Sequence, residues 1–175
     1  MDLRALVRTV ADFPKPGVQF RDITTLLKDA AGFRFVTERL AAAYRADGVE
    51  KVAAIESRGF IVGAALAYDL QSGFVPIRKA GKLPAGNFGR DYQLEYGTSR
   101  VEMHRDAIQP GERVLVVDDL IATGGTVEAS LELVRLAGGS VVGCAFVIDL
   151  PDLGGRARIE GLGYRVVALC EFAGH

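Results

Sequence analysis

Two adjacent aspartates, Asp118 and Asp119, stand shortly before a segment of small residues, A-T-G-G-T (residues 122–126). They follow a continuous apolar run at residues 114–117, which is typical of a parallel strand buried on both faces. After the small residues, apolar side chains recur at helical spacing up to Gly138, which predicts the end of a helix. A strand, a short loop and a helix N-terminus offer free backbone N–H groups, so this segment predicts an anion site.

The aspartates indicate which ligand this anion site receives. The segment has neither the Gly-Lys-Ser/Thr of a Walker loop nor the G-x-G-x-x-G of a dinucleotide fold. Because carboxylates repel phosphate, we expect Asp118 and Asp119 to face ribose hydroxyls, which can donate hydrogen bonds to them. A phosphate on residues 123–126 beside a ribose diol describes a 5-phosphoribosyl group. The alternative is that one aspartate only caps the helix and the loop is merely tight.

Basic residues follow two other predicted strands, residues 52–55 and 74–77. In the loop E-S-R-G (residues 56–59), Arg58 is suited to hold a second phosphate bidentately; the alternative is an exposed arginine at a helix start. The second strand leads to a basic segment containing Arg78, Lys79 and Lys82. This segment indicates neutralisation of a pyrophosphate, and a solvated basic turn is the alternative.

The loops require strands and helices to hold them. Strand-like runs that alternate with helical patterns imply right-handed βαβ crossovers, hence an α/β fold with a parallel sheet and helices on both faces. We expect the stretch that follows Lys82, up to about Gln93, to lack regular structure, as an active-site lid or a disordered loop does. The alternating residues 94–103 predict a lid hairpin arm and not a core strand.

The N-terminal region is expected to be irregular beyond its first helix. Asp2 can cap a short helix whose apolar residues 3, 6, 7 and 10 share one face. Residues 13–22 contain two prolines and a glycine, which break helix and strand alike. They indicate a stiff segment that folds over something; the alternative is a linker anchored to the core by Phe13 and Phe20.

Composition excludes several functional classes. A net charge of −1 over 175 residues gives no footprint for nucleic acid or an anionic membrane, and no apolar run approaches the ~18–20 residues of a span. The N-terminus lacks a signal-peptide layout. Cys144 and Cys170 are isolated in apolar runs, and the absence of C-x-x-C argues against a zinc site. We therefore expect one cytoplasmic domain, residues 1–175, without a nucleic-acid or membrane partner.

The motif at residues 114–126 resembles the phosphoribosyl pyrophosphate (PRPP) motif of the type I phosphoribosyltransferases, and the wider chain is similar to the adenine phosphoribosyltransferases of that family. Four more segments carry the resemblance in family order: F-P-K-P-G-V-Q-F-R-D-I-T (13–24), E-S-R-G-F (56–60), I-R-K-A-G-K-L-P (77–84) and L-E-Y-G (94–97). The first and last narrow it to adenine. The resemblance implies the type I phosphoribosyltransferase fold, with a small hood at about residues 1–30 and a flexible catalytic lid loop at about residues 80–95.

The resemblance also implies a reaction: adenine and PRPP give AMP and pyrophosphate through an oxocarbenium-like transition state. Mg²⁺ is the implied cofactor, held mainly through PRPP and water with no direct protein ligand. The implied catalytic residues are Arg58, Glu95 and Tyr96, with Glu95 managing purine protons. Without the resemblance, Glu95 is a solvent-facing strand glutamate. A non-proline cis peptide between Glu56 and Ser57 and a homodimer are expected on the resemblance alone.

The remaining site residues are carried over by position. Those expected to bind the phosphates and ribose are Arg58, Arg78, Lys79, Lys82, Asp118, Asp119, Ala122, Thr123, Gly124, Gly125 and Thr126. Those expected at adenine are Gln19, Phe20, Arg21 and Leu150, mainly through backbone groups and apolar contact from Phe20. Gln19 stands where the family usually has an aliphatic residue, which matters little if only its main chain is used.

Three other functions are alternatives to adenine phosphoribosyl transfer. The 6-oxopurine enzymes usually carry an aspartate at the position of Ala122, so hypoxanthine and guanine are disfavoured. A xanthine or orotate phosphoribosyltransferase would share the central motif but not residues 13–24. A PRPP-sensing regulator normally has an added DNA-binding segment, for which this length and charge leave no room.

Overall fold

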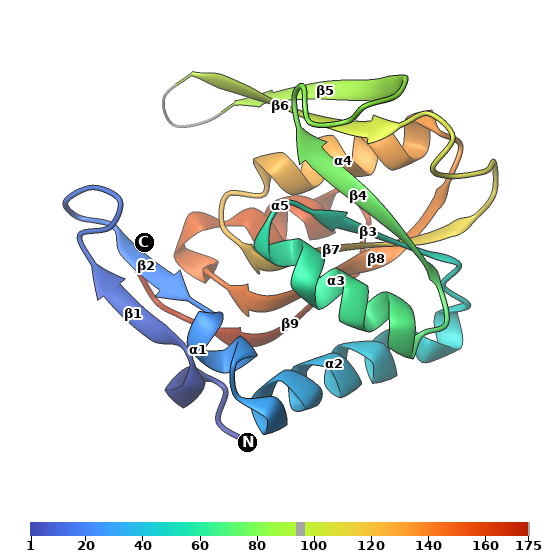
Figure 1. Ribbon diagram of the computed structural model, residues 1–175. Coiled ribbons are helices and arrows are strands. Elements are labelled where there is room, and N and C mark those ends of the chain that lie inside the picture. The colour runs from blue at the N-terminus through green and yellow to red at the C-terminus, as the bar shows by residue number, and fades with distance from the viewer. Residues whose placement is uncertain (94–96, 175) are drawn as a thin grey trace.

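A computed structural model of the protein describes residues 1–93 and 97–174. Within them, a seven-stranded sheet has the order β5-β6-β4-β3-β7-β8-β9 (Figure 1). Its parallel strands are β4 (Gly73–Lys79), β3 (Lys51–Ile55), β7 (Arg113–Ile121), β8 (Ser140–Asp149) and β9 (Val166–Glu171). The predicted α/β fold with a mostly parallel sheet is confirmed.

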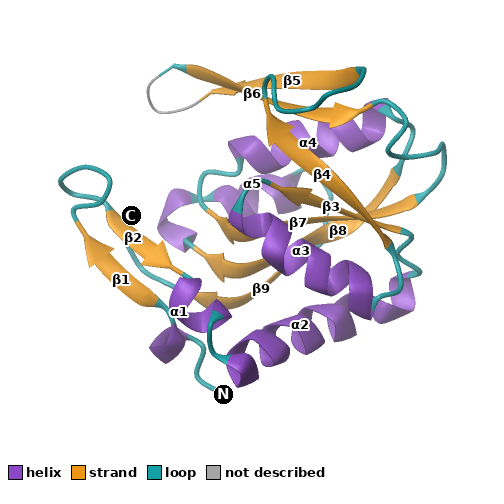
Figure 2. Ribbon diagram, in the orientation of Figure 1, coloured by secondary structure: helices purple, strands orange, loops and turns teal. Residues whose placement is uncertain are grey.

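Helices cover both faces of this sheet (Figure 2). On one face lie α1 (Thr24–Leu27), α2 (Ala30–Tyr44) and α3 (Arg58–Asp69); on the other lie α4 (Gly125–Leu136) and α5 (Gly155–Gly161). Short 3-10 turns complete the helical elements: η1 (Arg4–Leu6), η2 (Arg45–Asp47) and η3 (Pro151–Leu153). No helix in the described part of the chain is long and apolar enough to cross a membrane.

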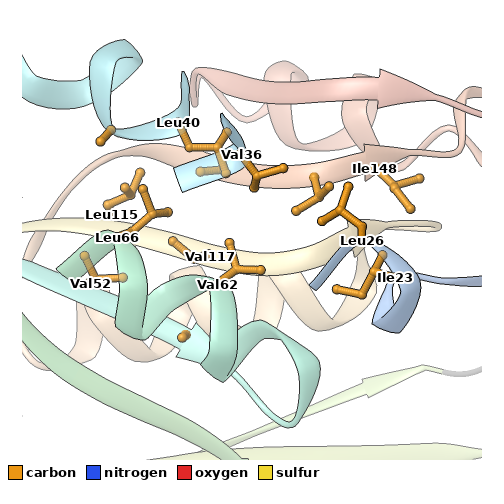
Figure 3. Packing of buried hydrophobic residues seen from close by; sticks show 14 of the residues in the cluster. Ile23, Leu26, Val36, Leu40, Val52, Val62, Leu66, Leu115, Val117 and Ile148 are labelled. Atoms are coloured by element: carbon orange, nitrogen blue, oxygen red, sulfur yellow. The ribbon is translucent and has the colours of Figure 1, made fainter. Parts of the chain in front are cut away.

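Alternate side chains of β7 pack on opposite faces of the sheet. This packing fixes the position of Asp118 and Asp119 near the carboxyl end of the strand. Leu115 and Val117 pack with α2 and α3 (Figure 3). Val114 and Val116 pack on the opposite face, in the hydrophobic cluster that contains the buried side chains of α4. All of these side chains are fully buried, and each contributes about 1.5–3 kcal/mol of hydrophobic stabilisation. The continuous apolar run is therefore a central strand, as its sequence predicts.

The hood is a separate antiparallel pair, β1 (Arg8–Ala11) and β2 (Gln19–Asp22). The prediction of a helix reaching residue 10 is wrong, because η1 ends at Leu6 and Val10 pairs with Phe20 across the strands. The prediction that residues 13–22 resist strand formation is wrong for their last four residues. Hydrogen bonds between the two strands determine the conformation of both segments. A local side-chain pattern does not show these bonds.

The expected irregular lid is mostly a hairpin. Residues 80–86 lie outside strands, but β5 (Asn87–Gln93) follows and pairs antiparallel with β6 (Thr98–His104). Since β6 also pairs with β4, the hairpin extends the main sheet. Val101 and Met103 are 1% and 0% exposed and belong to the same core cluster as α4, so the expectation that this arm is not core is wrong. The polar sequence of β5 does not predict a strand, because the strand is stabilised by packing against α4.

Candidate active site

The ends of β3, β4 and β7 meet at one edge of the sheet and line a cavity of about 380 Å³. Parallel strands bring their carboxyl ends to the same edge, so loops distant in sequence become neighbours. The predicted phosphate- and ribose-binding residues that line this cavity are Arg58, Lys79, Asp118, Asp119, Ala122, Thr123, Gly124, Gly125 and Thr126. We refer to this space as the phosphate cavity.

The small residues after β7 form a tight entry into α4. Gly124 has φ +81°, a left-handed conformation that a larger residue adopts only with strain, and α4 begins at Gly125. Among the described residues no side chain forms a capping hydrogen bond with this helix, so the alternative in which an aspartate serves as its cap is wrong. The first N–H groups of α4 have no partner within the helix and are available to an anion at the cavity.

The acidic pair carries a concentrated negative charge. Asp119 is 3% exposed, and its Oδ2 accepts a hydrogen bond from Arg58 Nε at 2.5 Å. Asp118 Oδ1 accepts the Asp119 backbone N–H at 2.8 Å. Burial and the adjacent Asp119 charge raise the pKa of Asp118 well above its ordinary value. The pair therefore favours hydrogen-bond donors or a cation as ligand, and ribose hydroxyls stay the predicted donors.

Arg58 is the first residue of α3 and lies between the phosphate cavity and the hood. The peptide bond between Glu56 and Ser57 is cis, as predicted. The Arg58 guanidinium carbon lies 5.1 Å from the centre of the Phe20 ring, while its Nε binds Asp119. Because its side chain is only 35% exposed and bonds to Asp119, the alternative of an exposed arginine at a helix start is wrong. In this structure the arginine pairs with Asp119 and offsets part of the negative charge of the acidic pair.

The other basic residues divide into different positions. Arg78 Nε donates to Glu56 Oε2 at 2.6 Å, and Arg78 Nη1 donates to the Lys82 carbonyl at 3.2 Å. Burial raises the pKa of Glu56, but the hydrogen bonds from Arg78 and from the Lys79 backbone N–H, together with the charges of both residues, outweigh it and leave the pKa lowered. Lys79 lines the phosphate cavity, whereas Lys82 and Arg78 do not. Arg78 thus holds the basic segment of residues 78–82 through its bonds to Glu56 and to the Lys82 carbonyl. The role of Glu56 was not predicted from the sequence.

A second cavity, of about 690 Å³, adjoins the first and shares Leu120, Ala122 and Thr123 with it. We refer to it as the base pocket. All four residues predicted to meet adenine line it: Gln19, Phe20, Arg21 and Leu150. The Arg21 guanidinium donates to Thr9 Oγ1 at 2.6 Å and to the Ala173 carbonyl at 2.8 Å, so it is already engaged within the hood and C-terminal segment.

The predicted catalytic residues Glu95 and Tyr96 lie outside the described residues. Gln93 and Arg158 line the base pocket, but sequence reasoning did not single them out. Arg158 stands in a polar stretch after β8, where the adjacent Gly154-Gly155 pair is the sequence feature that could have pointed to a close backbone approach.

An anion loop, an acidic pair and an apolar pocket at the carboxyl edge of a parallel sheet define the phosphoribosyl-binding class of proteins. The family model described as "Phosphoribosyl transferase domain" matches residues 24–162. A relative named adenine phosphoribosyltransferase, from Nitrosospira multiformis, is 60% identical over 175 residues, covering 100% of both chains. The chain belongs to the adenine phosphoribosyltransferase family.

Solved structures of that family share the fold. The adenine phosphoribosyltransferase of Rhodothermus marinus is 51% identical with a TM-score of 0.93, over 97% of this chain and 96% of the other. The Saccharomyces cerevisiae enzyme, complexed with adenine and an imino-altritol bisphosphate, is 35% identical with a TM-score of 0.89, over 97% of both chains. The comparison therefore extends over the hood as well as the sheet.

Proposed function

We propose that the protein transfers the 5-phosphoribosyl group of PRPP to N9 of adenine, giving AMP and pyrophosphate, and so serves purine salvage. The observation that carries this proposal is the pair of adjoining cavities, which share Leu120, Ala122 and Thr123. A sugar phosphate in the first cavity and a base in the second would meet at this shared wall. The yeast relative, solved with adenine and a bisphosphate, supports the same pairing of ligands.

Each part of the substrate has proposed partners. The 5-phosphate binds the loop of residues 122–126 and the N-terminus of α4. The ribose hydroxyls donate to Asp118 and Asp119. When pyrophosphate arrives, Arg58 exchanges its bond to Asp119 for the phosphate oxygens, which frees the carboxylate for ribose. Adenine lies in the base pocket against Phe20 and Leu150.

Departure of the pyrophosphate requires positive charge. Arg58 and Lys79 line the phosphate cavity, and we propose that they stabilise the developing negative charge, with Lys82 approaching from residues 80–86. Removing one such group is expected to lower the rate ~10²–10³-fold. Arg78 supports this role indirectly, because its bonds to Glu56 and to the Lys82 carbonyl hold the basic segment.

Mg²⁺ fits the donors of this site. The described residues contain no cluster of three or more His, Cys, Asp or Glu side chains able to hold a metal by themselves. Mg²⁺ usually keeps several waters and binds substrate phosphates, so we propose that PRPP and water hold it beside Asp118 and Asp119. The ion would supply additional positive charge for the pyrophosphate.

The attacking N9 must lose a proton, and we propose Glu95 for this role, with Tyr96 beside it. The proposal is based on the L-E-Y-G match at residues 94–97. As the C1–pyrophosphate bond breaks, positive charge develops on the ribose, and Asp118 and Asp119 lie on the side where the sugar would be held. The apolar side chains of Leu120 and Phe20 line the base pocket and would limit attack by water.

A base panel tests the proposal. The purified protein is mixed with PRPP, Mg²⁺ and, separately, adenine, guanine, hypoxanthine, xanthine or orotate, and nucleotide formation is followed by absorbance. We expect AMP from adenine and at most traces from the others. Product from guanine but not adenine would overturn the choice of base. PRPP binding without product from any base would favour a regulatory sensor.

We further propose that the protein is a cytoplasmic homodimer. Both cysteines, Cys144 and Cys170, are free thiols, which fits a reducing compartment. Ile61 and Tyr68 of α3 are 46% and 89% exposed, and Phe74 of β4 is 39% exposed, so apolar surface remains for a second subunit. Sedimentation at micromolar concentration should give twice the chain mass; a monomer at all concentrations would refute the dimer.

A further inference from the structure

One arginine of α5 contacts the back of the phosphate loop. Arg158 Nε donates to Glu128 Oε2 at 2.6 Å, and its Nη2 pairs with the same carboxylate. Arg158 Nη1 donates to the Thr123 carbonyl at 3.5 Å. Glu128 belongs to the first turn of α4, so a single side chain links α5, the loop and the helix that begins at the anion site.

The start of α5 reinforces the same contact. The Gly155 N–H donates to the Ala122 carbonyl at 2.9 Å, and a Cβ on Gly155 would overlap that carbonyl oxygen. A Cβ on Gly124 would meet the Gly155 carbonyl oxygen at 3.1 Å and Arg158 Cδ at 3.4 Å. The carbonyls of Ala122 and Thr123 are thus both engaged from the α5 side. The loop is held from behind at consecutive residues.

We infer that Arg158, together with Glu128, is a positioning residue that holds the phosphate loop in its anion-binding shape. The inference rests on the proposed function, in which this loop receives the 5-phosphate of PRPP and AMP. Arg158 already shares its charge with Glu128, so its contribution is to the geometry of the loop rather than to the net charge at the phosphate. Its planar fork reaches the carboxylate and the carbonyl at once, which a lysine ammonium does not reproduce.

Stability and affinity should separate in variants of this residue. The side chains of Arg158 and Glu128 are 51% and 29% exposed, and ion pairs of this kind add little to global stability. Loss of the brace should therefore leave the thermal midpoint nearly unchanged while the loop samples other shapes. Residues that act through a contact network of this kind change binding by about three- to thirtyfold.

The experiment compares Arg158→Gln, Arg158→Lys and Glu128→Gln with the parent protein. Calorimetry measures the Kd of ribose 5-phosphate, a probe without a base or pyrophosphate, and steady-state kinetics measure KM for PRPP and for adenine. Arg156→Gln is the matched control, because Arg156 also belongs to α5 but pairs with Glu160 at 3.0 Å and with Asp149 and Glu171 at 3.7 Å. The control should behave as the parent in each assay.

We expect Arg158→Gln to weaken ribose 5-phosphate about three- to thirtyfold and to raise KM for PRPP similarly, with kcat and KM for adenine changed less than about threefold. Glu128→Gln should do the same to a smaller extent, and Arg158→Lys should recover part of the affinity. Unchanged ribose 5-phosphate affinity overturns the inference.

Two other results also overturn it. A rise in KM for adenine alone would make Arg158 a base contact, since it lines the base pocket. An equal loss in Arg156→Gln would show a general disturbance of α5. Calorimetry measures binding without turnover. If the parent protein binds ribose 5-phosphate but makes no nucleotide, the proposed reaction is wrong, and the positioning role of Arg158 can still be measured.

Discussion

Replacing Asp118 with asparagine should stabilise the ligand-free protein and at the same time weaken PRPP binding. Burial and the neighbouring Asp119 charge raise the pKa of Asp118, so its ionised form is unfavourable in the folded state. Asparagine has nearly the same size, and its Oδ1 can still accept the Asp119 N–H, now at 2.8 Å. Its amide can also donate to the adjacent carboxylate, which an ionised Asp118 cannot do.

The size of the effect follows from the charges around the pair. Two like charges about 4 Å apart repel by about 4 kcal/mol at an effective dielectric constant of about 20. Arg58, at 2.5 Å from Asp119, cancels much of this, which leaves a gain of roughly 1–2 kcal/mol. For a chain of this size each kcal/mol shifts Tm by about 2–4 °C, so Asp118→Asn should melt roughly 2–8 °C higher at about pH 8.

The gain should depend on pH in a defined direction. Because the pKa of Asp118 is higher in the folded than in the unfolded protein, its ionisation destabilises the fold as pH rises through that interval. The advantage of the variant is therefore complete above the folded pKa and disappears as pH falls toward about 3.9, the unfolded value. Ribose would lose a charged acceptor, so PRPP affinity should fall about 10–100-fold.

Thermal unfolding of both proteins between about pH 4 and pH 8 without ligand, followed by PRPP titrations, checks this prediction. Asp91→Asn is the matched control, because Asp91 is 61% exposed and pairs with Arg100 at 3.0 Å. The control should shift stability by less than about 0.5 kcal/mol. A lower Tm for Asp118→Asn at the upper pH, or a gain that does not vary with pH, would refute the electrostatic reasoning. Unchanged PRPP affinity would refute the ribose contact.

Three further substitutions probe other parts of the molecule. Phe20→Ala removes an apolar wall of the base pocket and should raise KM for adenine about tenfold, with less effect on KM for PRPP. A larger rise in KM for PRPP than for adenine, measured by steady-state kinetics, would contradict this prediction. Tyr44→Phe removes the buried hydroxyl that donates to the Cys144 carbonyl at 2.8 Å, so denaturant titration should show a loss of about 1–2 kcal/mol with normal kcat. The hydrogen bond from Arg8 lowers the pKa of Asp22 to about 2, so Asp22 stabilises the fold above its unfolded pKa and less as pH falls toward 2. Asp22→Asn should be less stable near neutral pH by at most about 1 kcal/mol, since Arg8 is 58% exposed, and a deficit that persists unchanged at pH 2 would contradict this.

Local patterns were sufficient for the central unit of the site. The apolar run before Asp118, the small residues 122–126 and the helical spacing after them are contiguous, so the sequence specifies the β7–loop–α4 unit directly. The same holds for β3 and α3 around Arg58. Alternation of strands and helices then implies a parallel sheet, which brings the ends of β3, β4 and β7 to one edge without further information.

Non-local contacts determined the rest. Residues 87–93 carry no clear strand pattern, yet they form β5 because β6 and α4 give them backbone and packing partners. The pairing of Arg58 with Asp119 joins residues 61 positions apart, and the bond from Arg158 to Glu128 joins residues 30 positions apart. Side-chain type and spacing describe what a residue can bind, whereas tertiary packing decides which partner lies within reach.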